Sequence, residues 1–276
     1  MNFRFLTILF FCTAYLNVFS QDEVKYFPDD ISIAPFKANI LEPRLGFSPM
    51  LGKNEIRLDV GNSRDLYRNR SGNYLFSAGA ELFTFTKLRG EKDFHFPVDA
   101  VDYLFGMNFG FIYTLDGTKY GVRSRLSHIS AHFVDGHYDG PSASWRDGRN
   151  PRVYSREFVE FLPFIEKPDK RVYLGFTYLF HVVPRDLGKL IVQGGLEHDF
   201  TFLSFYGIQP YAAVDLKLQK IGKYSLTKNG VLGVKLGQYY GPGVSIYLGY
   251  FNGMSLHGEY YDYRESYFSW GFNIDL

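Results

Sequence analysis

The last ten residues, YFSWGFNIDL (267–276), alternate strictly between large apolar side chains and small or polar ones. Phe268, Trp270, Phe272, Ile274 and Leu276 share one parity, and the residues between them share the other. Successive side chains of a β-strand point to opposite faces. The segment therefore predicts a strand with one apolar face and one polar face.

The same period of two recurs along the chain, for example from Val101 to Tyr113 and from Val172 to Val182, where His181 belongs to the polar parity. An even number of strands is typical of single-chain bacterial barrels. The alternation predicts twelve strands, at 43–51, 54–62, 73–87, 101–115, 119–132, 153–164, 171–183, 189–198, 207–218, 229–238, 242–252 and 266–276.

Composition indicates which face is buried. Aromatic residues make up 19% of the chain, with 28 Phe and 22 Tyr, yet the mean hydropathy is only −0.16. So many large side chains do not fit inside a small closed barrel, whereas a membrane barrel needs aromatic girdles and an apolar outer band around a polar lumen. We predict an all-β, transmembrane antiparallel β-barrel. The alternative is a soluble β-sandwich or a lipocalin-like barrel with its apolar face inside.

The beginning of the chain is typical of a secretory signal peptide, because Arg4 precedes an apolar run to Phe19 that ends at Ser20. The run is short for a membrane anchor. The only cysteine, Cys12, lies within it, so the mature chain is expected to have no thiol. We expect a signal peptide at 1–20, a periplasmic or lumenal extension at 21–42, a barrel at 43–276, and a location in the bacterial outer membrane after cleavage near Ser20.

Loop lengths orient the predicted barrel. If the last strand descends to the periplasm, the short turns at 116–119 and 166–170 lie on the periplasmic side. The long segments 133–150 and 252–266 then lie outside, where barrel loops are long. Residues 63–72 are expected to be a rather long periplasmic connection.

Charge assigns the two faces of strand 119–132. An arginine facing lipid near mid-membrane costs about 2–4 kcal/mol, so Arg123 and Arg125 are expected in the lumen. Such residues line a pore or form an ion-paired plug, and cations opposite carboxylates favour a plug. A net charge of +1 offers no footprint for nucleic acid. The expected lumen-lining residues are Glu81, Asp102, Asn108, Arg123, Arg125, Asp215 and Lys217.

The opposite parity places His128, Ser130 and His132 on the lipid face, near the outer edge of the membrane. Polar groups facing lipid are costly and point to function. Two residues apart on one strand face, His128 can serve as the base and Ser130 as the nucleophile of an esterase acting on a lipid. A metal site of His128, His132 and Asp135 is disfavoured because the two histidines lie about 13 Å apart on a straight strand. The alternative function is a small channel or a plugged structural barrel without catalysis.

The His-x-Ser pair at the outer end of a strand resembles that of outer-membrane phospholipase A, a twelve-stranded barrel, and that of the lipid A deacylases. These resemblances imply a third residue that orients the histidine. The main candidates are Asn150, Glu157 and His132, and Asp135 and Asp139 are others. Ala131 and His132 replace the Asn-Gly that follows the serine in the phospholipase. Calcium is implied as a cofactor only by the phospholipase resemblance.

Three segments carry a further resemblance: FPDDISIAPFKANILEPR (27–44), HISAHFVDG (128–136) and RVYSREFVEF (152–161). Together they resemble a family of bacterial barrel proteins catalogued as a domain of unknown function, which implies fold and location. The final strand resembles the assembly signal of outer-membrane barrels, although it ends in Leu276 instead of Phe or Trp. The expected partners are therefore the barrel assembly machinery and outer-membrane lipids.

Overall fold

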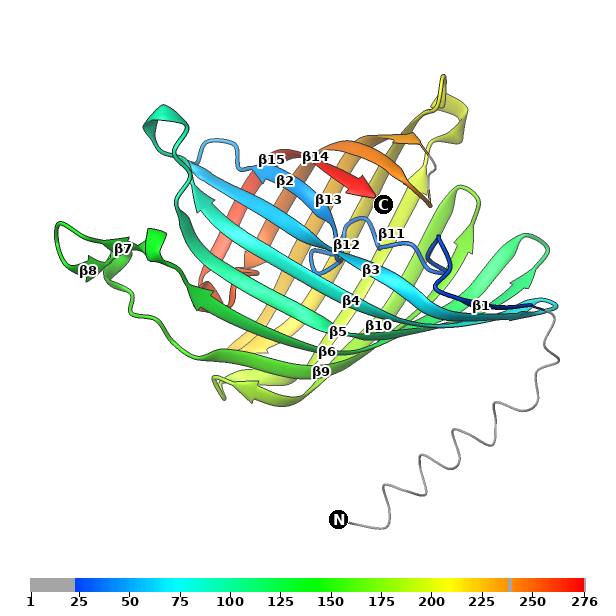
Figure 1. Ribbon diagram of the computed structural model, residues 1–276, viewed down its shortest axis with the longest axis horizontal. Coiled ribbons are helices and arrows are strands. Elements are labelled where there is room, and N and C mark those ends of the chain that lie inside the picture. The colour runs from blue at the N-terminus through cyan, green and yellow to red at the C-terminus, as the bar shows by residue number, and fades with distance from the viewer. Residues whose placement is uncertain (1–22, 238–239, 276) are drawn as a thin grey trace, which may run out of the picture.

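The structure is a computed structural model that describes residues 23–237 and 240–275. Twelve antiparallel strands form a closed barrel (Figure 1), in which β2 joins the last strand, β15, to β3. The predicted fold and strand number are confirmed. The barrel strands are β2 (Leu45–Pro49), β3 (Glu55–Ser71), β4 (Tyr74–Arg89), β5 (Val98–Leu115), β6 (Thr118–Phe133), β9 (Tyr154–Lys167), β10 (Lys170–Val183), β11 (Leu187–Asp199), β12 (Ile208–Ile221), β13 (Lys223–Gly237), β14 (Gly243–Met254) and β15 (Arg264–Asp275).

Short elements decorate the barrel. Strand β1 extends the sheet at one end of β3, and a small hairpin lies in the connection between β6 and β9. No helix of the described residues is long and apolar enough to cross a bilayer. The short elements are β1 (Glu23–Tyr26), η2 (Lys92–Phe94), η3 (Asp135–His137), β7 (Tyr138–Asp139), β8 (Ser144–Trp145), η4 (Arg146–Gly148), η5 (Thr201–Leu203) and η6 (Gly258–Tyr260).

The outward face of the barrel is apolar and the inward face is largely polar. On β6, Leu126 is 47% exposed and its neighbour Arg125 is 1% exposed. The same alternation places Phe176 of β10 and Trp270 of β15 on the outside. This inverts the arrangement of a soluble barrel and is what a lipid solvent requires.

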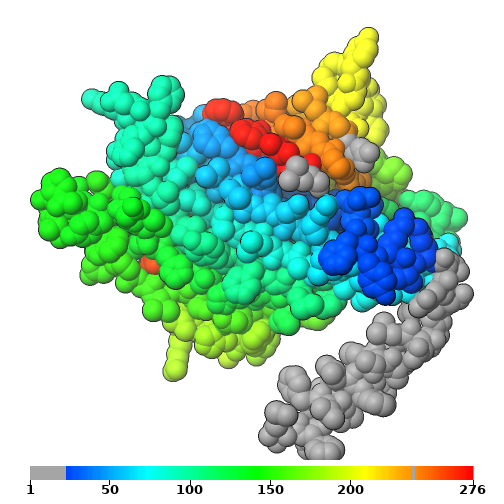
Figure 2. All heavy atoms as spheres, viewed as in Figure 1, coloured from blue at the N-terminus to red at the C-terminus, as the bar shows by residue number. Residues whose placement is uncertain are grey.

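The two ends of the barrel differ in the length of their connections. One end, here the turn end, carries the two-residue turns between β5 and β6 and between β9 and β10. Asp116 and Gly117 form the first of these with φ of 48° and 73°, the left-handed conformation that two-residue hairpins require. The opposite end, here the loop end, carries residues 134–153 and 255–263. Figure 2 shows residues 134–153, in green, projecting at one side and the blue N-terminal residues gathered at the other.

The expected connection at 63–72 is wrong, because β3 continues as a strand to Ser71 and the turn is confined to residues 72–73. Apolar alternation fades in this part of β3, which carries Arg64, Asp65 and Arg68. A bulge between Asp65 and Tyr67 also shifts its register against β4. Backbone pairing with β4 and β1, which hydropathy does not report, keeps the segment extended.

Residues 27–44, here the plug segment, pass through the barrel interior between β1 and β2 (Figure 1). Phe36 is fully buried and packs on Tyr173 of β10, with ring centroids 4.3 Å apart. Arg171 of β10 donates hydrogen bonds of 2.8 Å to the carbonyl oxygens of Ala34 and Pro35. A side chain of the barrel wall thus satisfies buried carbonyl groups of the segment.

Candidate functional site

Five polar side chains gather on the outward face of β6, β9 and β10, near the loop end. The strand register aligns them, because His128 pairs with Glu157, Glu157 with His181, and Ser130 with Ser155. Just toward the turn end, the next row of outward residues is apolar and contains Leu126, Val159 and Tyr178. We call this set the outer-face cluster, and its members are His128, Ser130, Ser155, Glu157 and His181.

His128 and Glu157 form the centre of the cluster. His128 donates its Nδ1–H to Glu157 Oε1 at 2.6 Å, and the two side chains are 26% and 27% exposed. This bond fixes the tautomer in which Nε2 carries the lone pair. Nε2 is the nitrogen that a base needs when its Nδ1–H is held by a carboxylate. The ring of Phe105 lies 4.9 Å from the His128 ring and limits its rotation.

His181 joins the cluster through an irregularity in β10. The alternation of β10 predicts that His181 faces the lumen, and this is wrong. A bulge between Leu179 and His181 shifts the register against β9 by one residue, which turns His181 outward and Val182 inward. One extra residue in a strand reverses the facing of all residues beyond it. Nδ1 of His181 consequently hydrogen-bonds Oε2 of Glu157.

The two serines of the cluster differ in their hydrogen bonds. Ser155 Oγ donates to Glu157 Oε1 at 3.1 Å. Ser130 Oγ makes no hydrogen bond to another residue within 23–237 and 240–275. Ser130 follows His128 by two positions on the same strand face, about 7 Å between their Cα atoms at the usual rise. Its hydroxyl therefore lies on the same strand face as the His128 ring, without a competing partner among the described residues.

The cluster lies at one border of the apolar band. His128 is ten residues beyond the start of β6, which corresponds to roughly 25 Å along the barrel axis for a strand tilted by about 40°. The apolar band of membrane barrels is about 25 Å tall. The exposed rings of Tyr103 and Phe105 on β5 and of Tyr178 and Phe180 on β10 flank the cluster.

The structure separates the three main candidates for the residue that orients His128. Glu157 is in contact with it. His132 is exposed farther along β6, where its ring lies 6.1 Å from that of Tyr103. Asn150 is exposed in the loop before β9, seven residues ahead of Glu157, and forms no hydrogen bond to His128. The sequence signal that favours Glu157 over Asn150 and His132 is its position on β9, because Glu157 shares the outward parity of Val159 and Phe161.

The surroundings of Ser130 do not fit a calcium ion held by this chain alone. Calcium takes six to eight oxygen ligands, mostly carboxylates and carbonyls. The cluster has one carboxylate, Glu157, and both of its oxygens are already hydrogen-bonded. Among the described residues, no group of three His, Cys, Asp or Glu side chains is arranged to hold a metal ion.

The seven residues expected in the lumen all lie on the inward face and are buried. Arg123 and Arg125 sit at the centre of an ion network. Arg123 donates two hydrogen bonds of 2.6 Å to Glu42 of the plug segment, and Arg125 binds both oxygens of Glu160 at 2.7 and 2.8 Å. Glu81 lies 3.6 Å from Arg125. These pairs join β4, β6, β9 and the plug segment across the interior.

The remaining lumenal residues bind nearby walls or loops. Asp102 accepts from His257 Nδ1 at 2.9 Å and from the Gly258 N–H at 2.7 Å, which fixes the 255–263 loop to β5. Asp215 accepts from Tyr173 at 2.7 Å. Lys217 donates to Asn39 Oδ1 of the plug segment at 2.7 Å. Asn108 donates to Ser63 at 2.9 Å.

A closed antiparallel barrel with an apolar exterior and a charged, plugged interior defines the class of twelve-stranded outer-membrane-type β-barrels. Within that class the chain belongs to the family described as "Protein of unknown function (DUF1207)", whose model matches residues 96–275. No curated protein sequence matches the chain.

Solved structures of outer membrane phospholipases resemble the fold. Outer membrane phospholipase A from Escherichia coli superposes with a TM-score of 0.54 at 14% identity, covering 89% of this chain and 99% of that one. The calcium-bound dimer of the Salmonella typhi outer membrane phospholipase superposes with a TM-score of 0.52 at 13% identity, covering 87% and 93%. At this level of identity the likeness shows a shared fold.

Proposed function

We propose that this protein is a serine esterase of the bacterial outer membrane that cleaves acyl ester bonds of lipids in the leaflet at its loop end. One observation carries the proposal: the hydrogen bond from His128 to Glu157 on the lipid-facing surface, beside the free hydroxyl of Ser130. A polar dyad that faces lipid destabilises the barrel, and its presence there points to a function. The ionic contacts across the plugged lumen give less support to a channel.

The roles follow from the geometry. Ser130 Oγ attacks the ester carbonyl carbon while His128 Nε2 takes the hydroxyl proton, and Glu157 stabilises the imidazolium that forms. The tetrahedral intermediate collapses, and the lysolipid alkoxide leaves with the proton from His128. Water, deprotonated by His128, then attacks the acyl-Ser130 ester, and Ser130 Oγ leaves with the proton from His128, which releases the fatty acid and restores the free enzyme. Phospholipid and lipopolysaccharide both supply such esters.

The proposal includes how the protein reaches its membrane. A signal peptide at residues 1–20, cleaved near Ser20, would direct the chain across the inner membrane. These residues lie outside the described part of the chain. The barrel assembly machinery would then recognise β15, whose alternation of aromatic and small residues faces lipid and lumen. Outer-membrane lipids are the remaining proposed partner.

The test is fatty-acid release by the refolded barrel from phospholipid mixed micelles and, separately, from lipopolysaccharide, each with calcium and with a chelator. Ser130→Ala should abolish release. Ser124→Ala is the matched control, because Ser124 lies on the same strand and parity, six residues away from Ser130. A serine-directed sulfonyl fluoride should label Ser130 and leave Ser155 unmodified.

The outcomes separate the alternatives. Release that survives in Ser130→Ala would refute the assigned nucleophile. Absence of release from both lipids under all conditions, with a correctly folded barrel, would refute the esterase. Release that needs calcium would show that the ion binds outside the described cluster, because Glu157 has no free oxygen for it.

A further inference from the structure

A buried arginine of β9 has no counter-charge among the residues that the structure describes. Arg156 points into the lumen and is 8% exposed, and its Nε is buried without a hydrogen-bond partner. Within residues 23–237 and 240–275 its guanidinium forms no hydrogen bond or ion pair. The guanidinium carbon lies 5.9 Å from the centroid of the Tyr154 ring. The buried Arg123, Arg125 and Arg171 each bind a carboxylate. A buried charge without a partner is strongly unfavourable, so Arg156 requires an explanation.

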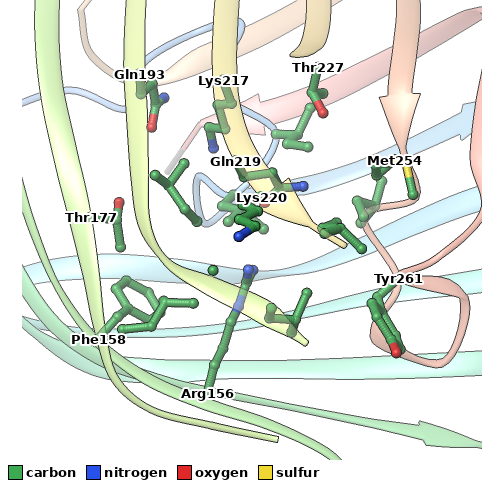
Figure 3. A pocket seen from close by; sticks show the side chains of 18 of the residues that line it. Arg156, Phe158, Thr177, Gln193, Lys217, Gln219, Lys220, Thr227, Met254 and Tyr261 are labelled. Atoms are coloured by element: carbon green, nitrogen blue, oxygen red, sulfur yellow. The ribbon is translucent and has the colours of Figure 1, made fainter. Parts of the chain in front are cut away.

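Arg156 reaches into a cavity of about 60 Å³ at the loop end of the lumen, lined by residues of β9 to β14, of the plug segment and of the 255–263 loop. Figure 3 shows its guanidinium directed into the cavity, which Lys217 and Lys220 of β12 also line. Lys220 also forms no hydrogen bond or ion pair to the described residues. Glu160 is the one carboxylate that lines the cavity, and Arg125 already occupies both of its oxygens. The cavity therefore has an excess of positive charge.

In contrast to this positive charge, much of the cavity wall is apolar. Leu179, Leu187, Ile191 and Leu256 line the cavity and belong to the buried apolar cluster of the lumen. A single water needs roughly 10–15 Å³, so the cavity accommodates a group of several heavy atoms. Its lining includes the exposed Lys220 and the partly exposed Met254, which gives it an edge at the barrel surface.

We infer that this cavity binds a monocarboxylate with a short aliphatic chain, which includes the head of a fatty acid. The carboxylate would bind Arg156, whose fork of N–H groups matches it in geometry, and Lys220 would add a second positive charge. The chain would lie against Leu179 and Ile191. A bare inorganic anion would leave these apolar side chains without contacts. The site is independent of the proposed esterase, because Arg156 and Glu157 point to opposite sides of β9.

The test is isothermal titration calorimetry of hexanoate against the full refolded barrel in a nonionic detergent. Hexanoate should bind the wild type, and Arg156→Gln should weaken its binding at least tenfold. Arg185→Gln is the matched control, because it removes an exposed cation at the same end of the barrel but outside the cavity. Hexanol and inorganic phosphate supply the tail and the charge separately, and each should bind at least tenfold more weakly than hexanoate.

A second measurement does not depend on the ligand. Arg156→Met removes an unpaired buried charge, so the unliganded variant should unfold at a higher temperature than the wild type. A lower unfolding temperature would assign Arg156 to the structure and overturn the proposal. So would hexanoate binding that is absent, or equal in Arg156→Gln and the wild type, in barrels that show native heat-modifiable mobility on gels. Phosphate binding as tight as that of hexanoate would overturn the assigned ligand class.

Discussion

Glu157 on β9 faces His128 on β6 at directly paired positions, and the two side chains hydrogen-bond at 2.6 Å on the outside of the barrel. The same carboxylate binds His181 of β10 through its second oxygen. Three adjacent strands thus contribute to one polar row on a surface that is largely apolar. Substitutions of Glu157, His128 and His181 therefore test whether this surface is catalytic.

Glu157→Gln should lower fatty-acid release by ~10²–10⁴-fold, because the neutral amide no longer stabilises the imidazolium or enforces the Nδ1–H tautomer of His128. The steady-state rate on phospholipid micelles measures the effect. Glu91→Gln, in the exposed 90–97 loop, serves as the control. A Glu157→Gln enzyme as active as the wild type would contradict the role assigned to this carboxylate.

The two histidines should not be equivalent. His128→Ala should abolish release, whereas His181→Ala should lower it by about tenfold or less, since His181 contacts Glu157 but lies across β9 from Ser130. Comparing kcat of the two variants shows which histidine is the base. The reverse order would make His181 the base. It would move the nucleophile to Ser155, which lies two residues before Glu157 on β9 and pairs with Val183 of β10.

The lumenal network should contribute strongly to stability. Arg125→Ala leaves Glu160 and Glu81 buried without their shared cation, which we expect to cost about 3–5 kcal/mol. Urea unfolding in lipid vesicles, followed by tryptophan fluorescence, gives the change in free energy. Arg70→Ala, which removes an exposed arginine near the turn end, should change it little. Equal midpoints for the two variants would show that the network is not a stabilising plug.

The lipid-facing assignment has its own test. Leu126→Arg introduces a charge into the outward apolar row one step from the cluster toward the bilayer centre. It should destabilise the barrel in vesicles by about 1–3 kcal/mol, because the cost of about 2–4 kcal/mol at the centre falls toward the border. Tyr138→Arg, in the exposed 134–153 loop, is the control. If Leu126→Arg unfolds at the wild-type urea concentration, this face does not contact lipid.

Period-two alternation was sufficient to predict the barrel, its strand number and the facing of β6. The reason is visible at Arg123 and Arg125, where two charges on one parity leave a single arrangement compatible with lipid. The same logic places Glu157 outward on β9. What it does not give is the contact between Glu157 and His128, which depends on the register between strands separated by a loop of twenty residues (134–153).

Alternation failed where the backbone departs from a regular strand. In β10 the apolar residues alternate in the sequence without a break from Val172 to Val182, so nothing in the pattern marks the bulge that turns His181 outward. The bulge is set by pairing with β9, a property of two strands together. Arg156 illustrates a second limit, because its parity indicates the lumen but not that its neighbours there lack a carboxylate.

The barrel is closed by its shortest strand. β2 makes three ladder pairs with β15 and four with β3, and the plug segment precedes it directly in the chain. The seam therefore requires the first and last strands of the barrel to meet, the closure with the largest loop entropy in the molecule. Because so few backbone pairs close the barrel and β2 follows the plug segment directly, we expect the barrel to close only when the plug segment lies inside it. A chain whose interior is not filled is then expected to stay an open sheet with two unpaired edges.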